Sequence, residues 1–348
     1  MTDTGLTSSQ DMALTSTYDT GLTSSYDAGL TSTYDTEVPV TQAFESAGPR
    51  PTDRPGRQST GPAAAQATGL PGTHDAGADR ITAPVHISGP SGPWHKVREG
   101  MDLRGNAVVH TTWGEWLSVA VADPALRPLL GRDWQRYRNT ADPTIRYRFV
   151  ASRLAVKFTA AAALGTEPAE LDLAYKIGGR PYLRGLDQID VSLTHTDDLI
   201  AVGISRSGRI GVDAEPADRQ MSFELLQGHV CTPAERAELD LLPEQEQVAG
   251  MLRLWTLKEA YTKALGQGLR LGFTEFGFGV DSGGLLAPDG TPAARDEWAF
   301  ATHRVLGRYL ISVACHDSGL DTSRDTAART MLDEGFMGAV AELLEADG

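Results

Sequence analysis

The chain has 348 residues, and hydrophobic residues make up 41% of them. Its formal net charge is −15; residues 1–93 hold 4 basic and 10 acidic residues, so the remainder, with 27 basic and 36 acidic residues, carries a charge of −9. This acidic balance excludes a nucleic-acid-binding protein with a broad basic surface, so any site for an anionic ligand must be local.

Two further features bear on where the protein works. The two cysteines, Cys231 and Cys315, are too few for a disulfide framework and have no metal-ligand spacing, which is typical of a reducing compartment. The N-terminus lacks the regions of a signal peptide, and no apolar run approaches the about 18 residues of a membrane helix. We expect a cytoplasmic protein without a membrane or nucleic-acid partner. Since the eight histidines show no clustered spacing, we expect no zinc.

Residues 1–93 have the composition of a disordered tail. An octapeptide repeat, first "DTGLTSSQ" from Asp3, occurs four times and offers one Leu and at most one Tyr per repeat, too little apolar area to offset chain entropy. The following residues up to Pro93 are rich in Pro, Gly, Ala and Thr and resemble a linker. All six tryptophans lie from Trp94 onward. We therefore predict that the folded part begins at Trp94, with a repeat architecture as the alternative to disorder. A phosphorylated or protein-binding role of the tail stays open.

The first predicted element of the folded part is a long helix over residues 143–164. Asp142 offers an N-cap, Pro143 suits the first helical position and Gly165 is a stop signal. Apolar residues recur at helical spacing between them. Its basic side chains form either a solvated face or part of an anion site; they are Arg146, Arg148, Arg153 and Lys157.

Three short strands are predicted next, over residues 189–194, 199–205 and 209–216. "IDVSLT" and "RIGVDAEP" alternate in polarity, whereas "LIAVGIS" is a continuous apolar run. If the three form an antiparallel meander, the first and third strands run in the same direction. His195 and the Asp213/Glu215 pair then lie at the same sheet edge, roughly 10 Å apart.

The remaining pattern repeats helices followed by strands. Helices are predicted from Thr232 to Leu242, opened by a capping box, and from Met251 to Gly266. A hairpin joins residues 298–304 to 308–316. We therefore predict an α+β fold of two similar halves related by pseudo-twofold symmetry, 94–208 and 209–330, with residues 331–348 as a C-terminal helix or tail.

"RIGVDAEP" places two carboxylates on one face of a strand. Asp213 and Glu215 share that face with Gly211, while Ile210 and Val212 share the other. Two carboxylates at this spacing are close enough to share a divalent cation, and without one they repel each other. The alternative is an exposed polar face on an edge strand.

A third carboxylate lies in "WTLKEAYTKALGQGL". Lys258, Glu259, Thr262 and Lys263 fall within two helical turns. They form either a surface helix with a Glu259–Lys263 pair, or one carboxylate flanked by two ammonium groups as expected around a magnesium-bound diphosphate. Spacing alone leaves both interpretations open.

Four motifs in order are similar to those of a known family. "GRPYL", "SLTHT", "IGVDAE" and "WTLKEAYTKALGQGL" follow one another as GKP, NxSHS/T, GxDxE and W-S/T-x-K-E-A/S-x-x-K do in 4′-phosphopantetheinyl transferases of the large, monomeric Sfp type. The resemblance spans most of Trp94 to about His316. It departs from the pattern where Ser192 replaces Asn, Thr194 replaces Ser and Arg180 replaces Lys.

The resemblance implies a role for each matching residue. The residues matching the magnesium-binding acids are Asp213, Glu215 and Glu259. Those matching the coenzyme A contacts are Arg148, Arg180, Thr194, His195, Lys258 and Lys263. Glu259 is the implied general base, or only a third metal ligand, and Lys263 resembles the lysine that contacts the diphosphate and assists the leaving group.

The implied reaction is magnesium-dependent transfer of 4′-phosphopantetheine from coenzyme A to a serine of an acyl or peptidyl carrier protein, releasing adenosine 3′,5′-bisphosphate. We expect a monomer that binds the carrier through residues 216–241, where Met221, Phe223 and Leu225 otherwise form a helix packed on its own domain. A different magnesium-dependent nucleotide phosphotransferase or phosphodiesterase, and a non-catalytic carrier-binding scaffold, are the alternatives.

Overall fold

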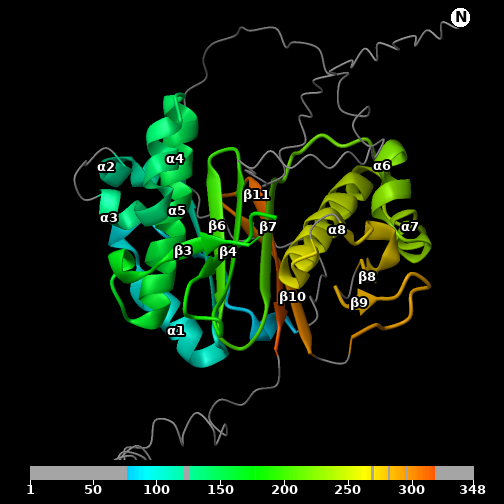
Figure 1. Ribbon diagram of the computed structural model, residues 1–348. Helices are drawn as coiled ribbons and strands as arrows, with labels where there is room; N and C mark the ends of the chain where they lie inside the picture. The colour runs from blue at the N-terminus through cyan, green and yellow to red at the C-terminus, as the bar shows by residue number, and fades with distance from the viewer. Residues whose placement is uncertain are drawn as a thin grey trace, which may run out of the picture.

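The computed structural model describes residues 77–120, 126–176, 178–267, 270–280, 283–294 and 297–317. These residues form a mixed α+β structure in which the sheets lie between two groups of helices (Figure 1). The octapeptide repeat and the predicted C-terminal helix or tail lie outside the described residues. Within these ranges, no helix combines the length and the apolar character needed to cross a membrane.

The folded part begins before Trp94. Strand β1 (Val85–His86) pairs in parallel with β2 (Asn106–Thr112). Ile81 and Ile87 are 4% and 0% exposed. The predicted disordered tail was therefore wrong for residues 77–93, because β2 provides a partner strand and these two isoleucines enter the core.

The N-terminal half is built on a four-stranded sheet in the order β1-β2-β6-β5. β6 (Leu199–Ser205) pairs antiparallel with both β2 and β5 (Asp190–Thr196), so both of its edges are occupied. A separate hairpin joins β3 (Leu173–Tyr175) to β4 (Pro181–Leu183). The helices of this half are α1 (Trp94–Arg104), α2 (Leu117–Ala120), α3 (Leu126–Leu130), α4 (Trp134–Asn139) and α5 (Pro143–Leu164).

Helix α5 has the bounds that its capping residues predict. The Asp142 side chain accepts a hydrogen bond from the Ile145 N–H, and Pro143 occupies the first helical position. Gly165 ends the helix in the left-handed conformation with φ 68°. The helix packs on the sheet through a core cluster that includes Val156 of α5.

The C-terminal half is built on a three-stranded sheet in the order β10-β11-β7. Its strands are β7 (Ile210–Pro216), β10 (Trp298–Val305) and β11 (Tyr309–His316), with β8 (Gly277–Phe278) and β9 (Leu285–Leu286) in a small hairpin. Its helices are α6 (Phe223–Val230), α7 (Pro233–Leu239) and α8 (Glu244–Leu265). The last helix begins seven residues before the predicted Met251, because Pro243 takes the N-cap position.

The main elements follow the same order in both halves. A strand (β2 or β7) precedes a 22-residue helix (α5 or α8), and a two-stranded hairpin (β5–β6 or β10–β11) follows it. In each sheet the first strand pairs antiparallel with the second strand of the hairpin. A third apolar cluster, including Val108, Ala201, Val212 and Val313, lies between the two sheets. The layers therefore run helix, sheet, sheet, helix.

The predicted single meander of β5, β6 and β7 was wrong. β7 lies beside β5 but belongs to the other sheet, because β6 already has a partner on each edge. Side chains of β5 accept the amide hydrogens of β7: Ile210 N donates to Asp190 Oδ2 at 2.8 Å and Val212 N to Ser192 Oγ at 3.0 Å. We call this contact of β5 with β7 the seam.

Candidate active site

Strand β7 has two buried faces of opposite character. Val212 and Ala214 enter the cluster between the sheets, as the alternation predicts. The carboxylates of Asp213 and Glu215 lie on the other face and are also buried, with residue exposures of 0% and 4%. The exposed edge strand considered as the alternative is therefore excluded, and two carboxylates need partners in the interior.

Helix α8 approaches the acidic face of β7 at Gly211. A Cβ atom at this position would lie 1.8 Å from the Ala260 carbonyl oxygen and 2.6 Å from the Ala264 nitrogen. Only glycine permits this approach of helix to strand, because both obstructing atoms belong to the backbone. The contact brings Glu259 and Lys263, 4% and 6% exposed, to the acids of β7.

Asp213 lies at the centre of the site. Its Oδ1 accepts from Lys263 Nζ at 2.6 Å and from the Thr194 hydroxyl at 3.3 Å. Lys263 Nζ also donates to the Thr194 oxygen at 3.3 Å. The second carboxylate oxygen, Oδ2, is buried without a hydrogen-bond partner among the described residues. One oxygen of Asp213 is thus neutralised within the chain, and the other remains an unsatisfied acceptor.

The other two acids resist ionisation. Burial, followed by the neighbouring Asp213, raises the pKa of Glu215 to about 7, although Arg219 forms an ion pair with it. Burial and then Asp213 likewise raise the pKa of Glu259 to about 7. Three carboxylates therefore crowd a buried site in which the neighbouring cations do not fully compensate their repulsion.

The predicted magnesium ligands are thus close enough to repel one another, but they are not arranged as a finished metal site. Within the residues described, no group of three or more His, Cys, Asp or Glu side chains is placed to hold a metal ion. The chemistry of the donors fits a hard cation, since carboxylate oxygens are its preferred ligands and the Asp213 Oδ2 is unsatisfied. In this structure Lys263 and Arg219 lie against two of the three acids instead.

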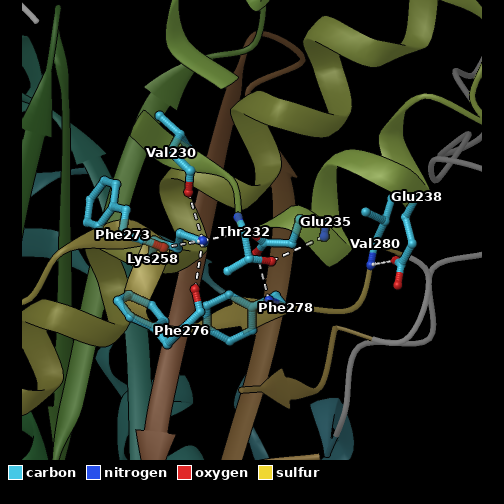
Figure 2. Close-up of polar contacts among 9 residues, drawn as sticks. All are labelled: Val230, Thr232, Glu235, Glu238, Lys258, Phe273, Phe276, Phe278 and Val280. Atoms are coloured by element: carbon cyan, nitrogen blue, oxygen red, sulfur yellow. Dashed lines mark hydrogen bonds and ion pairs between the residues drawn. The ribbon is translucent and has the colours of Figure 1, made fainter. Parts of the chain in front are cut away.

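The structure does not bring Lys258 to the three acids. Its side chain is 0% exposed, and its ammonium lies in a separate network with Glu235 and three backbone carbonyls (Figure 2). Lys263 reaches the acids and Lys258 does not, although both belong to the same motif. The two lysines therefore have different environments.

Arg180 and Ser192 form hydrogen bonds at the seam. The Arg180 guanidinium contacts Asp190 and donates to the Ile210 carbonyl at 2.8 Å and to that of Lys263. It thereby joins β5, β7 and α8 through backbone oxygens. Ser192, which replaces the family's Asn, accepts from the Val212 N–H, so the hydroxyl takes over local hydrogen bonding.

The remaining predicted coenzyme residues lie nearer the N-terminal half. His195 is half-buried on β5, on the face opposite to that of Thr194, because successive strand residues alternate. Arg148 is exposed on α5, with its guanidinium 5.8 Å from the centre of the Trp113 ring. Of the predicted coenzyme residues, the structure therefore gathers only Thr194 and Lys263 tightly around Asp213.

Sequence reasoning missed Arg219. The residue lies four positions after Glu215 and forms an ion pair with it, while its guanidinium lies 5.7 Å from the centre of the Trp255 ring. The available signal was a basic residue shortly after an acidic strand. That signal is not sufficient by itself, because the ion pair depends on the turn after Pro216. In this turn the Arg219 N–H donates to the Pro216 carbonyl.

Comparison with known proteins finds a family similarity in the C-terminal half. Residues 209–314 match the 4′-phosphopantetheinyl transferase superfamily. The chain is 30% identical over 130 residues to 4′-phosphopantetheinyl transferase HetI of Nostoc sp., covering 36% of this chain and 55% of the relative. It is 26% identical over 190 residues to a phosphopantetheinyl transferase of Thraustochytrium sp., covering 51% and 66%.

A 4′-phosphopantetheinyl transferase of Bacillus subtilis is 24% identical over 147 residues, which is 41% of this chain and 64% of the relative. The chain thus spans between about half and two thirds of the length of these curated relatives. The matched region, residues 209–314, contains Asp213, Glu215, Glu259 and Lys263. This region is therefore similar to the 4′-phosphopantetheinyl transferase superfamily.

Proposed function

We propose that this protein transfers the 4′-phosphopantetheine group of coenzyme A to a serine of an acyl or peptidyl carrier protein. The observation that carries this proposal is the buried cluster of Asp213, Glu215 and Glu259 with Lys263 against it, inside the region that matches the superfamily. A buried site rich in carboxylates with a local ammonium suits a diphosphate bound together with a divalent cation.

Magnesium is the cation that this donor set favours. Asp213, Glu215 and Glu259 would hold it, and the unsatisfied Oδ2 of Asp213 and the raised pKa values of both glutamates support this assignment. When bound, the cation neutralises charge on the diphosphate and polarises the attacked phosphorus. A cation also relieves the repulsion among the three acids, which lowers the pKa values of the glutamates.

The chain's own residues move the proton and offset charge. Glu259 would accept the proton of the carrier serine, directly or through a water molecule, because its carboxylate lies in the acidic cluster beside Asp213. Lys263 offsets the negative charge that develops on the leaving phosphate once it exchanges Asp213 for the diphosphate. The Thr194 hydroxyl is hydrogen-bonded to both Asp213 and Lys263, and it thereby holds the Lys263 ammonium at the site.

The coenzyme's nucleotide end lies towards the N-terminal half in this proposal. His195 and Arg148 would bind its phosphate, with support from their placement at the end of β5 and on α5. Arg180 contributes by holding β5, β7 and α8 together, because its guanidinium is engaged with Asp190, Ile210 and Lys263.

The carrier protein would dock on the segment from Pro216 to Leu241. Leu225 of α6 is 58% exposed, whereas the half-buried Met221 and Phe223 pack against the core of the C-terminal half. Carrier proteins of this kind are typically acidic and this chain is acidic too, so an apolar contact suits recognition better than net charge.

The symmetry of the fold, the oligomeric state and the location of the protein complete the proposal. The repeated order of strand, helix and hairpin supports two halves related by a pseudo-twofold axis, as in the Sfp type. We infer a monomeric, cytoplasmic enzyme, and two free, buried cysteines are compatible with a reducing compartment. Residues 1–76 are proposed to be dispensable for transfer.

The test is incubation of the purified full chain with an apo carrier protein, coenzyme A and Mg²⁺. We expect the carrier serine to gain the mass of one phosphopantetheine group, and EDTA to prevent it. Cleavage of coenzyme A without labelling of several different carriers would favour a nucleotide phosphodiesterase instead. Loss of labelling on deletion of residues 1–76 would make the tail part of the active enzyme.

A further inference from the structure

Lys258 belongs to the motif that carries Glu259 and Lys263 but lies on a different side of α8. Successive residues of an α-helix are rotated by about 100°, so Glu259 and Lys263, four positions apart, share a side that Lys258 does not. The contacts agree: Lys263 Nζ reaches Asp213, while Lys258 Nζ reaches Glu235 of α7.

The ammonium of Lys258 has no donor left for a ligand. It carries three N–H bonds. Four protein oxygens accept them: Val230 O at 2.8 Å, Glu235 Oε2 at 2.7 Å, Phe273 O at 2.6 Å and Phe276 O at 2.9 Å (Figure 2). The side chain is also 0% exposed, so a coenzyme phosphate has neither access nor a free donor.

Glu235 extends the same network away from the acids. Its Oε2 accepts from the Thr232 N–H at 2.7 Å, and its Oε1 accepts from the Phe278 N–H at 2.7 Å. The ion pair with Lys258 therefore ties three segments to α8: the end of α6, the capping box of α7 and the strand β8. Both partners of the pair are fully buried and fully hydrogen-bonded.

The N-terminal half contains an equivalent lysine where there is no acidic site. Lys157 is the fifteenth residue of α5, as Lys258 is of α8. Lys157 Nζ donates at 2.7 Å to the Leu129 carbonyl, 28 residues earlier, and Lys258 Nζ donates to the Val230 carbonyl, also 28 residues earlier. A buried lysine that bonds the helix two before its own thus recurs in both halves, which marks it as part of the scaffold.

We propose that Lys258 is a positioning residue that fixes α8 to α6, α7 and β8, so that Glu259 and Lys263 face Asp213, and that it does not contact coenzyme A. This inference rests on the proposed function. It also links the docking segment to the catalytic helix, because Val230 and Glu235 belong to that segment. Loss of Lys258 should then lower turnover and carrier recognition more than it lowers coenzyme affinity.

A direct test uses the unmodified full chain. The sequence has five lysines, so ¹⁵N-lysine labelling gives few ammonium signals, which single Lys→Arg variants assign. On addition of coenzyme A with MgCl₂, we expect the Lys263 signal to shift, while those of Lys258 and its scaffold counterpart Lys157 stay in place. A shift of Lys258 comparable to that of Lys263 would overturn this inference and leave the proposed function intact. No shift of any lysine would overturn both.

Variants supply the functional half of the test. In Lys258→Met, Glu235 is left as a buried unpaired charge, whereas Glu235→Gln/Lys258→Met removes both charges. We expect kcat to fall about tenfold in the single variant and to recover in part in the double variant, because coupled residues are non-additive. The calorimetric Kd for coenzyme A should rise less in Lys258→Met than in Lys263→Met, and the rise should be smaller still in the double variant.

Two comparison variants complete the set. Lys263→Met should weaken coenzyme A binding about tenfold or more, since it removes a charge-assisted contact. Lys157→Met should lower the midpoint of thermal unfolding without changing kcat or KM. If Lys258→Met weakens coenzyme A binding as Lys263→Met does, and the double variant does not recover, Lys258 is a ligand and the proposal is wrong. Should the single variant fail to fold, the double variant and the labelled wild-type chain still decide.

Discussion

Helices α5 and α8 take the same place in the order of elements of the two halves, but only α8 carries the proposed catalytic residues. Both have 22 residues, end at a left-handed glycine and bury a lysine at the fifteenth position. At the sixteenth and twentieth positions α5 has Phe158 and Ala162, where α8 has Glu259 and Lys263. Two polar residues on a single helical side therefore distinguish α8 from α5.

The strands beneath these helices differ in the same way. The second, fourth and sixth residues of β2 include Ala107 and Val109, which pack against α5 in an apolar cluster. The corresponding residues of β7 are Gly211, Asp213 and Glu215. The N-terminal half buries hydrocarbon between helix and strand, whereas the C-terminal half gives up that stabilisation to bury charge.

The largest effect is expected from the substitution that removes the carboxylate of Glu259 on α8. Glu259→Gln should lower the rate of carrier labelling about 100- to 10,000-fold, because the amide cannot accept the serine proton. The metal-free variant should unfold at a higher temperature than wild type, since one repelling charge is lost from the cluster. Glu244→Gln, in the exposed first turn of α8, is the matched control and should remain active. Normal labelling by Glu259→Gln would remove Glu259 from its proposed role.

The next effect concerns the approach of helix and strand. Gly211→Ala places a methyl group against Ala260 O and Ala264 N and should lower the free energy of unfolding by about 3 kcal/mol. Labelling should fall with it, because α8 is displaced from Asp213. The reciprocal change in the other half, Ala107→Gly, should cost about 1 kcal/mol and leave activity intact. Denaturant titrations measure both, and equal losses would show that the two interfaces are equally tight.

The halves should also respond to pH in opposite directions. Burial lowers the pKa of His110 in β2 to about 4, so its contribution to stability is present above about pH 6.5 and is lost as the pH falls. Burial raises the pKa of Glu215 and Glu259 to about 7, so their contribution is present near pH 4.5 and is lost as the pH rises towards 7.

Denaturant titrations in EDTA across pH 4 to 8 test this contrast. In His110→Gln, the free energy of unfolding should no longer increase as the pH rises from 4 to about 6.5. In Glu259→Gln, its decrease as the pH rises towards 7 should be smaller than in wild type. Mg²⁺ at pH 8 should restore stability in wild type more than in Glu259→Gln. A wild-type profile that Mg²⁺ leaves unchanged would contradict a metal-binding role for the acids.

The smallest effect compares two exposed leucines. Leu225→Glu on α6 should raise KM for the carrier about threefold to tenfold without changing KM for coenzyme A. Leu103→Glu, on α1 of the N-terminal half and 69% exposed, is the matched control and should leave both values unchanged. Equal effects of the two substitutions would move the docking surface away from α6.

Local signals predicted the individual elements well. Asp142, Pro143 and Gly165 mark the ends of α5 because capping is a property of neighbouring residues. The alternation of "RIGVDAEP" predicted the two faces of β7, and the motif order predicted that Glu259 and Lys263 would meet it. These features depend on period and on short-range chemistry.

Features that depend on distant partners were not predictable. The meander was wrong because β2 was not recognised, and β2 occupies the edge of β6 that the meander assigned to β7. The surroundings of Lys258 depend on Glu235 and on carbonyls up to 28 residues away along the chain. Helical spacing places this lysine on a different side of α8 from Lys263, but it does not show which groups lie against that side.

The seam between β5 and β7 also determines how these two strands are aligned with each other. An ordinary strand ladder looks the same after a slide of two residues, since every peptide offers the same donors and acceptors. At the seam the acceptors are side chains, and only Asp190 and Ser192 meet the Ile210 and Val212 amides. Side-chain identity therefore sets how far one half slides along the other, and this in turn decides that Thr194 is the residue of β5 that meets Asp213.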